Sequence, residues 1–273
     1  MHKPLVKKVT DLGVNTVLLL LVAVALLPFV FMVVTAIQRA ESVSLSFNLD
    51  RLQLDNFARL FTQYGFGRAL VTSAVVVTLA CLVNLVVCSL AAFAFAKKPF
   101  PGSETLFWIY IATMMVPVQV TIIPLFLIIR DLGLLNTPVA LILPIINAFG
   151  VFLIRQFMSG VPDELLEAAR IDGAADLRIF ASIVLPLIKP VLIALTVFTF
   201  ITAWNDFLWP LVAVSDESMQ TVTLAAARLQ GRFVTEHGLV MAGATVSFLV
   251  PFIVYVLLQR QFVQGVASVG LKG

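Results

Sequence analysis

Residues 69–95 read ALVTSAVVVTLACLVNLVVCSLAAFAF, an apolar run without a single charged side chain. A helix needs about 20 apolar residues to cross the hydrocarbon core of a bilayer. A lone strand in lipid would leave its backbone N–H and C=O groups unpaired, so only a helix or a closed barrel can span it. This run is continuously apolar and does not alternate as barrel strands do, so it predicts a transmembrane helix.

Five further stretches of the chain pass the same test, at approximately 13–37, 105–129, 137–158, 184–213 and 238–259. Of the 273 residues, 60% are hydrophobic and only 12% are charged. The charged share is about half the roughly 25% of a soluble domain, and the mean hydropathy is +1.05. We therefore expect one all-α integral membrane domain over residues 1–273, with six transmembrane helices.

The first apolar stretch follows Lys3, Lys7 and Lys8, which is also the order of charge and hydrophobicity in a signal peptide. Its apolar core at 17–37 is longer than the roughly 7–15 residues of a signal-peptide core, and no small-residue cleavage site clearly follows it. We interpret it as a retained first transmembrane helix.

The distribution of lysine predicts the orientation in the membrane. Lysine and arginine concentrate in cytoplasmic loops. With both termini in the cytoplasm, all seven lysines lie inside: Lys3, Lys7, Lys8, Lys97, Lys98, Lys189 and Lys272. The outer loops then carry arginines balanced by acidic residues: Arg39, Arg51, Arg59, Arg68, Arg130, Arg228 and Arg232 against Glu41, Asp50, Asp55, Asp131, Asp216, Glu217 and Glu236.

The composition also argues against catalysis and nucleic-acid binding by this chain. The sequence contains no G-x-x-x-x-G-K-[ST] phosphate-binding loop, so any ATP hydrolysis must belong to another subunit. His2 and His237 stand alone, which leaves neither a metal-ligand cluster nor a catalytic triad, and we expect no metal and no cofactor on this chain. Cys81 and Cys88 share one predicted helix, where small packing residues are the expected role. The net charge of +3 reflects membrane topology and does not indicate nucleic acid.

The one sizeable cytoplasmic insertion, at 159–183, predicts a helix–turn–helix. Pro162 suits a helix start, and Asp163 with Glu164 complements the positive end of the helix dipole. Gly173 permits the left-handed turn that ends the helix, and a second short helix begins near Asp176. Such an element could seat in a groove on a soluble partner and move the two flanking spans, although a plain connector has the same helix chemistry.

Sequence motifs in and around this insertion carry a family resemblance. Glu167-Ala168-Ala169, Asp172-Gly173-Ala174 and Leu185-Pro186 resemble the EAA loop of binding-protein-dependent ABC importer permeases. Further stretches resemble the maltose-type sugar permeases: Met114–Gln119, Pro124-Leu125, Leu132–Thr137, Phe152–Phe157, Trp204–Asp206 and Gln261–Gly265. The similarity runs from about Asn56 to the C-terminus and is to the smaller, six-helix partner of that class.

The resemblance implies a type I importer permease in the bacterial plasma (inner) membrane, with a cytoplasmic coupling loop and four kinds of partner. These are a second permease subunit, two ATPase subunits that bind ATP and Mg, an extracytoplasmic solute-binding protein, and the lipid bilayer. The outer loop at 214–237 would contact the binding protein, and the tail from Gln264 would approach the ATPase dimer. The implied ATPase-coupling residues are Glu164, Glu167, Ala168, Ala169, Asp172, Gly173 and Ala174.

Polar residues within the predicted spans are candidates for a solute pathway, because such residues are expensive in lipid and usually face the bundle interior or a cavity. The polar candidates are Asn84, Gln119, Asn147, Thr199, Thr202, Asn205 and Asp206. Helical spacing would place Thr199, Thr202 and Asn205 on one face, joined by Trp209. An aromatic ring beside hydroxyl and amide groups suits a sugar, but hydrogen bonds between helices would use the same residues. The preferred pathway set is Asn84, Asn147, Thr199, Thr202, Asn205 and Trp209.

Other functions remain open at this level. A secondary transporter would place ionisable residues near the span centres, whereas Asp206 lies toward the end of its predicted span. A membrane-embedded enzyme would need a catalytic constellation that this sequence lacks. The sequence gives little reason to exclude an importer of the same class for a non-sugar solute, such as a glycerol phosphodiester.

Overall fold

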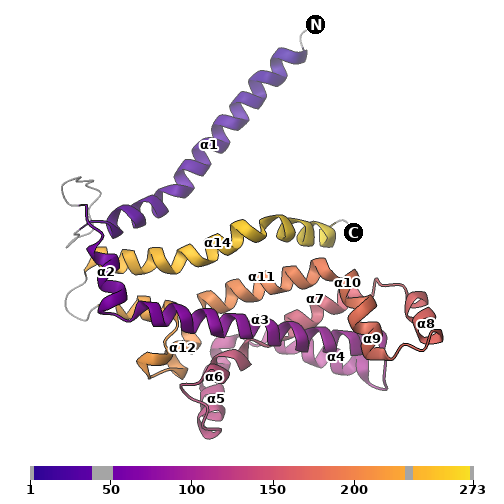
Figure 1. Cartoon of the computed structure of the whole chain (residues 1–273). Helices are drawn as coiled ribbons and strands as arrows, with labels where there is room; N and C mark the ends of the chain where they lie inside the picture. The colour runs from indigo at the N-terminus through magenta and orange to yellow at the C-terminus, as the bar shows by residue number, and fades with distance from the viewer. Residues whose placement is uncertain (1–2, 39–51, 231–235, 271–273) are drawn as a thin grey trace. The chain divides into compact units, whose positions relative to one another are not determined.

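The computed structural model describes residues 3–38, 52–230 and 236–270, with side chains described for 13–38, 52–230 and 236–259 (Figure 1). Within these ranges the chain is helical apart from turns and one isolated antiparallel bridge between Gln38 and Leu52. The expectation of an all-α fold is confirmed. The outer charges at 39–51, the outer-loop positions 231–235 and the end of the tail at 271–273 lie outside the described residues.

The chain divides into two compact units. Unit 1 comprises residues 1–67 and 226–248, and unit 2 comprises residues 68–225 and 249–273. The helices of unit 1 are α1 (Lys3–Ala36), α2 (Asp55–Thr62) and the first part of α14 (His237–Gly270).

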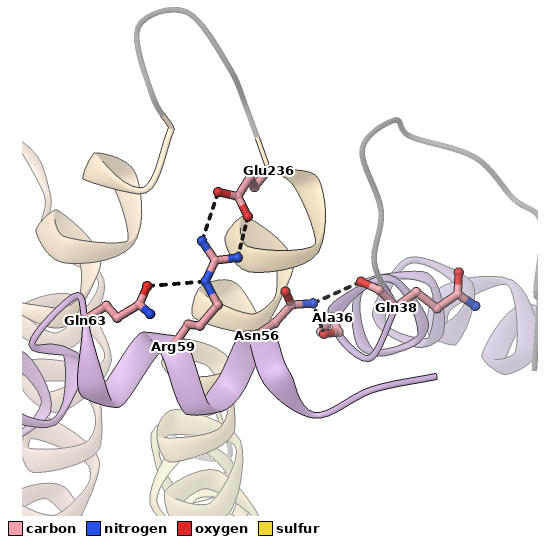
Figure 2. Close-up of polar contacts among 6 residues, drawn as sticks. All are labelled: Ala36, Gln38, Asn56, Arg59, Gln63 and Glu236. Atoms are coloured by element: carbon pink, nitrogen blue, oxygen red, sulfur yellow. Dashed lines mark hydrogen bonds and ion pairs between the residues drawn. The ribbon is translucent and has the colours of Figure 1, made fainter. Parts of the chain in front are cut away.

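In unit 1, α2 ties together the end of α1 and the start of α14 (Figure 2). The buried side-chain amide of Asn56 donates to the carbonyl oxygens of Ala36 at 2.8 Å and Gln38 at 3.0 Å. The guanidinium of Arg59 forms a two-pronged ion pair with Glu236, at 2.5 and 3.0 Å. This pair raises the pKa of Arg59 above its ordinary value, so its charge is permanent.

Unit 2 contains most of α3 (Phe66–Lys97) and a series of shorter helices. These are α4 (Ser103–Ala112), a 3-10 turn (Thr113–Met115), α5 (Val118–Asp131), α6 (Pro138–Ile142), a 3-10 turn (Leu143–Ile145), α7 (Ala148–Met158), α8 (Asp163–Ile171), α9 (Asp176–Ile179), a π-helical turn (Phe180–Val184), α10 (Leu185–Leu187), α11 (Lys189–Asn205), α12 (Leu208–Ala213) and a 3-10 turn (Glu217–Met219). The next helix, α13 (Val222–Arg228), begins in unit 2 and ends in unit 1.

Three continuous helices are long and apolar enough to cross a membrane: Gly13–Ala36, Phe66–Lys97 and His237–Gln259. Three bent pairs pass the same test together: Ser103–Met115 with Val118–Asp131 at 103°, Pro138–Ile145 with Ala148–Met158 at 48°, and Asp176–Leu187 with Lys189–Asn205 at 81°. By length and composition the described chain therefore has three spans, or up to six if each pair is one span. The apolar stretches at 105–129, 137–158 and 184–213 are not straight helices. Proline adjoins each break, where it removes a backbone donor.

Close packing joins α3, α7 and α11 at one point in unit 2. A Cβ atom on Gly150 of α7 would lie 2.6 Å from Sγ of Cys88 and 3.3 Å from Cδ2 of Leu195. Only glycine permits this approach, because real Cβ contacts do not reach 2.6 Å. Cys81 and Cys88 are free and buried, in agreement with the packing role expected for them.

Candidate functional site

The helix–turn–helix expected at 159–183 is present as α8 and α9 (Figure 1). Pro162 directly precedes α8, and Asp163 with Glu164 occupies its first turn. After the helix ends, Gly173 has φ of 79°, and the N–H of Ala174 donates back to the carbonyl of Ala169 at 2.9 Å. A residue with a side chain would be strained there, so the glycine defines the turn.

The two faces of α8 differ in what they contact. Leu166 is buried in the hydrophobic core of unit 2, against which Ala169 and Ala174 also pack. The other predicted coupling residues are exposed: Glu164, Glu167, Ala168, Asp172 and Gly173. Ile171 is 87% exposed on the same loop, and sequence reasoning overlooked it. The sequence feature that could have identified Ile171 is its apolar side chain at the end of an otherwise polar helix face.

Two lysines at the end of α3 hold this loop, and sequence reasoning used them only as topology markers. Lys97 donates to the carbonyl of Val161 at 2.6 Å and to the carboxylate of Asp163 at 2.7 Å. Lys98 pairs with Asp176 at 2.5 Å. No sequence signal could have identified these partners, because the residues lie more than sixty positions apart in the chain.

A cavity of about 460 Å³ lies in unit 2. It is lined by residues of α5, the α6–α7 break, α11 and α12: Val118, Ile122, Leu125, Pro144, Ile145, Asn147, Phe198, Thr199, Thr202, Ala203, Asp206, Leu208 and Trp209. Four predicted pathway residues, Asn147, Thr199, Thr202 and Trp209, are therefore brought together. Among these lining residues Asp206 is the one ionisable side chain.

The other predicted pathway residues do not line this cavity. Asn84 is completely buried, and its amide donates to the hydroxyl of Thr199 at 2.9 Å. Asn205 is exposed and donates to the carbonyl of Ile201 one turn back at 2.9 Å. Gln119 is exposed on the first turn of α5. For Asn84 the structure supplies the alternative role, a hydrogen bond between helices.

The expectation that Trp209 continues the face of Thr199 and Thr202 is wrong. The helix α11 ends at Asn205, and Trp209 belongs to α12. Its indole N–H donates to the carbonyl of Ala140 at 2.8 Å, so Trp209 reaches the cavity from a separate, anchored helix. The side chain of Asn147 caps α7 by accepting from the N–H of Gly150 at 3.1 Å.

Within the described ranges, no group of three or more His, Cys, Asp or Glu side chains could hold a metal ion. Comparison with known proteins supplies the remaining observation. Residues 84–268 match the family described as binding-protein-dependent transport system inner membrane component. The chain belongs to this family. It is thus a multi-pass inner membrane transport permease, which agrees with the importer interpretation rather than with a secondary transporter or an enzyme.

Several permeases of this family are similar along most of the chain. The arabinooligosaccharides transport system permease protein AraQ of Halalkalibacterium halodurans is 35% identical over 239 residues, which cover 85% of this chain and 84% of the relative. The lactose transport system permease protein LacG of Rhizobium radiobacter is 31% identical over 261 residues, covering 95% and 96%. The sn-glycerol-3-phosphate transport system permease protein UgpE of Yersinia pestis is 41% identical over 206 residues, covering 74% and 73%.

Solved structures share the fold. A chain of a bacterial ABC transporter involved in the import of the acidic polysaccharide alginate matches with a TM-score of 0.82 and 23% identity, over 93% of this permease and 97% of that chain. A chain from the complex of a bacterial alginate transporter with its pentasaccharide-bound periplasmic protein matches with a TM-score of 0.68 and 15% identity, over 94% and 97%. The expected type I importer fold is confirmed.

Proposed function

We propose that this permease forms half of the translocation path for a sugar or sugar-like solute. An extracytoplasmic binding protein delivers the solute, and a separate ATPase drives transport by docking on α8 and α9. The assembly is a heterotetramer of this chain, a second permease and two ATPase copies. Both termini and the α8–α9 loop lie in the cytoplasm, as the lysine distribution predicts. The observation that carries the proposal is the exposed outer face of α8.

That outer face has the properties of a docking surface. Leu166 fixes the inner face of α8 in the core of unit 2, so the element is held in place. Outside, the carboxylate of Glu167 offers a charge to a basic partner, and Ala168 allows close approach. Ile171 exposes an apolar side chain that a partner pocket would bury, with a gain of roughly 1.5–3 kcal/mol for full burial.

Two substitutions test the docking assignment. Glu167→Lys reverses the charge on the outer face, and Gly173→Asp places a side chain at a positive φ. Both variants should insert in the membrane at wild-type levels but lose ATP-driven uptake by about tenfold or more, a coupling loss of 1–3 kcal/mol. Gly133→Asp is the matched control, because Gly133 also has a positive φ, of 69°, and open space around it. Wild-type uptake and stimulated ATP hydrolysis in both loop variants would refute the assignment.

The solute class follows from the cavity and the relatives. The relatives AraQ and LacG are named for sugar transport. The cavity combines the hydroxyls of Thr199 and Thr202 with the indole ring of Trp209, which suits a solute with both hydroxyl groups and C–H faces. The carboxylate of Asp206 disfavours an anion at close range.

A phosphate-bearing glycerol derivative is the second candidate, because the UgpE relative has higher identity over a shorter stretch. The two solutes can be separated by thermal shift of the cognate binding protein. A panel of neutral mono- and oligosaccharides should raise its melting temperature, whereas sn-glycerol-3-phosphate should not. Stabilisation by sn-glycerol-3-phosphate alone would favour the second candidate.

Thiol labelling tests whether the cavity belongs to the path. In a background lacking Cys81 and Cys88, cysteines at Thr199 and Thr202 should react with a water-soluble thiol reagent, and their reactivity should change when the ATPases are trapped with nucleotide. A cysteine at Asn205, which is exposed and does not line the cavity, tests whether the path extends to the end of α11. A cysteine at the buried Val197 is the control and should stay unreactive. Equal labelling at all positions, or none, would assign these groups to packing.

A further inference from the structure

Lys97, the last residue of α3, and Lys98, the residue after it, hold two different helices of the coupling loop. Lys97 binds the start of α8 through the carbonyl of Val161 and the carboxylate of Asp163. Lys98 binds Asp176, the first residue of α9. The lysine pair therefore connects α3 to the loop without any chain continuity between them.

Lys97 differs from Lys98 in burial. The side chain of Lys97 is 3% exposed, whereas that of Lys98 is 37% exposed. A buried ammonium is unfavourable unless it is paired and hydrogen-bonded, and Lys97 uses two of its three donors on the start of α8. Its position at the C-terminus of α3 also complements the helix dipole. Lys97 therefore forms a directed, two-point link that cannot shift without exposing or unpairing its charge.

The helix α3 continues from this link to the cavity wall. Asn84 lies thirteen residues before Lys97 on α3, which is about 20 Å along a helix. There its amide donates at 2.9 Å to the hydroxyl of Thr199, which lines the cavity. One continuous helix thus carries the loop contact at one end and a cavity contact further along.

We propose that Lys97 is a positioning residue that makes α3 move together with α8 when the ATPase moves the coupling loop. The chain itself connects the loop to α7 on one side and to the helices leading into α11 on the other. Through Lys97, movement of the loop also moves α3, a third membrane helix. The helix α3 then acts on the cavity through the hydrogen bond of Asn84 to Thr199. This inference rests on the proposed docking of an ATPase on α8 and α9.

The test uses the complete transporter with its ATPase, second permease and binding protein in proteoliposomes. Lys97→Met removes the charge while keeping the length of the side chain, and Lys97→Arg keeps a cation with several donors. The Met variant should retain the ATPase on co-purification and keep basal ATP hydrolysis within about twofold. Its solute transported per ATP hydrolysed should fall by about tenfold. The Arg variant should recover most of this ratio, and Lys98→Met should stay within about twofold of wild type.

Equal transport per ATP in the Met and Arg variants would overturn the inference. Loss of the ATPase from the Met variant on co-purification would also overturn it, because Lys97 would then only hold the docking surface in shape. If the Met variant is not recovered from membranes, the ratio for Lys97→Gln against Lys97→Arg decides in the same way. The Gly173→Asp variant separates the two proposals. An unaffected Gly173→Asp refutes ATPase docking, whereas an uncoupled Gly173→Asp beside a fully coupled Lys97→Met refutes only the role of Lys97.

Discussion

Two loops of unit 2 are fixed by opposite kinds of chemistry. The coupling loop is held by the ion pairs of Lys97 with Asp163 and of Lys98 with Asp176. The loop after α12 is held by one neutral residue, Asn136. The side-chain oxygen of Asn136 accepts from the N–H groups of Ser215 and Asp216, both at 2.8 Å.

The difference shows what each attachment can transmit. An amide bonded to backbone N–H groups fixes the local shape of the α12 loop and is little affected by salt. Both attachments join segments far apart in the sequence. The charged side chains tie the coupling loop to the end of the long helix α3, whereas Asn136 joins the turn between α5 and α6 to the loop after α12. Salt screens the attraction between Lys98 and Asp176 far more than that between Lys97 and Asp163, because the side chain of Lys97 is buried. The following substitutions test this contrast, from the largest expected effect to the smallest.

Asp163→Ala should destabilise the permease most, because it leaves the buried ammonium of Lys97 with only the carbonyl of Val161. We expect a loss of about 1–3 kcal/mol, the penalty for an under-satisfied buried polar group, even though Asp163 itself is largely exposed. Thermal unfolding of the purified transporter in detergent measures it. Asp131→Ala, which breaks the exposed pair with Arg130, is the control and should change little. Equal melting temperatures for the two variants would show that burial of Lys97 does not matter.

Asn136→Ala should loosen the loop after α12 by about 1 kcal/mol. It removes the acceptor for Ser215 and Asp216 and places alanine at a φ of 59°. Asn136→Gly removes the same acceptor without the backbone strain and should lie between alanine and wild type. Hydrogen exchange of the peptide covering 214–219 reports the change. Unchanged exchange in both variants would show that Asn136 does not hold this loop.

Lys98→Met should have a smaller effect, of about 0.2–1 kcal/mol, because its partner Asp176 and the lysine itself are both partly solvated. Added salt should reduce the difference between wild type and variant, whereas the effect of Asp163→Ala should persist better. Melting temperatures at low and high ionic strength provide the measurement. A Lys98→Met effect that is independent of salt would indicate lost packing of the lysine stem.

Acid should produce the smallest change, at Asp216. The N–H of Ser218 donates to its carboxylate at 2.7 Å and lowers the pKa of Asp216 below its ordinary value. The folded loop therefore holds this proton less tightly than the unfolded chain does. The stabilisation of the loop by the ionised carboxylate of Asp216 is fully present above the unfolded pKa of about 3.9. It is lost as the pH falls through the pKa of the folded state. Pepsin cleavage within 214–219 should rise slightly over that window, and Asp216→Asn should flatten the rise. A steeper rise in the Asn variant would contradict this.

Local chemistry made the coupling loop predictable from the sequence. Acidic residues at a helix start and Gly173 at its end specify the helix and the turn without reference to the rest of the chain. The predicted spans run straight through the breaks at Pro117 and Asp206, because the apolar runs continue there and hydropathy does not record the direction of a helix. The anchoring of Trp209 to Ala140 and the role of Asn84 depend on contacts distant in sequence, which a single sequence does not specify.

The crossing at Gly150 gives α3 the geometry of an unequal lever. Gly150 meets α3 at Cys88, which lies nine residues from Lys97 and four from Asn84. These arms are about 13 Å and about 6 Å long. For a rigid α3 turning about this contact, movement at the Lys97 end reaches Asn84 in the opposite direction and at roughly half the amplitude. A large sweep at the coupling loop would thus become a small, reversed displacement of Asn84 beside the cavity, on the scale of a hydrogen bond made or broken.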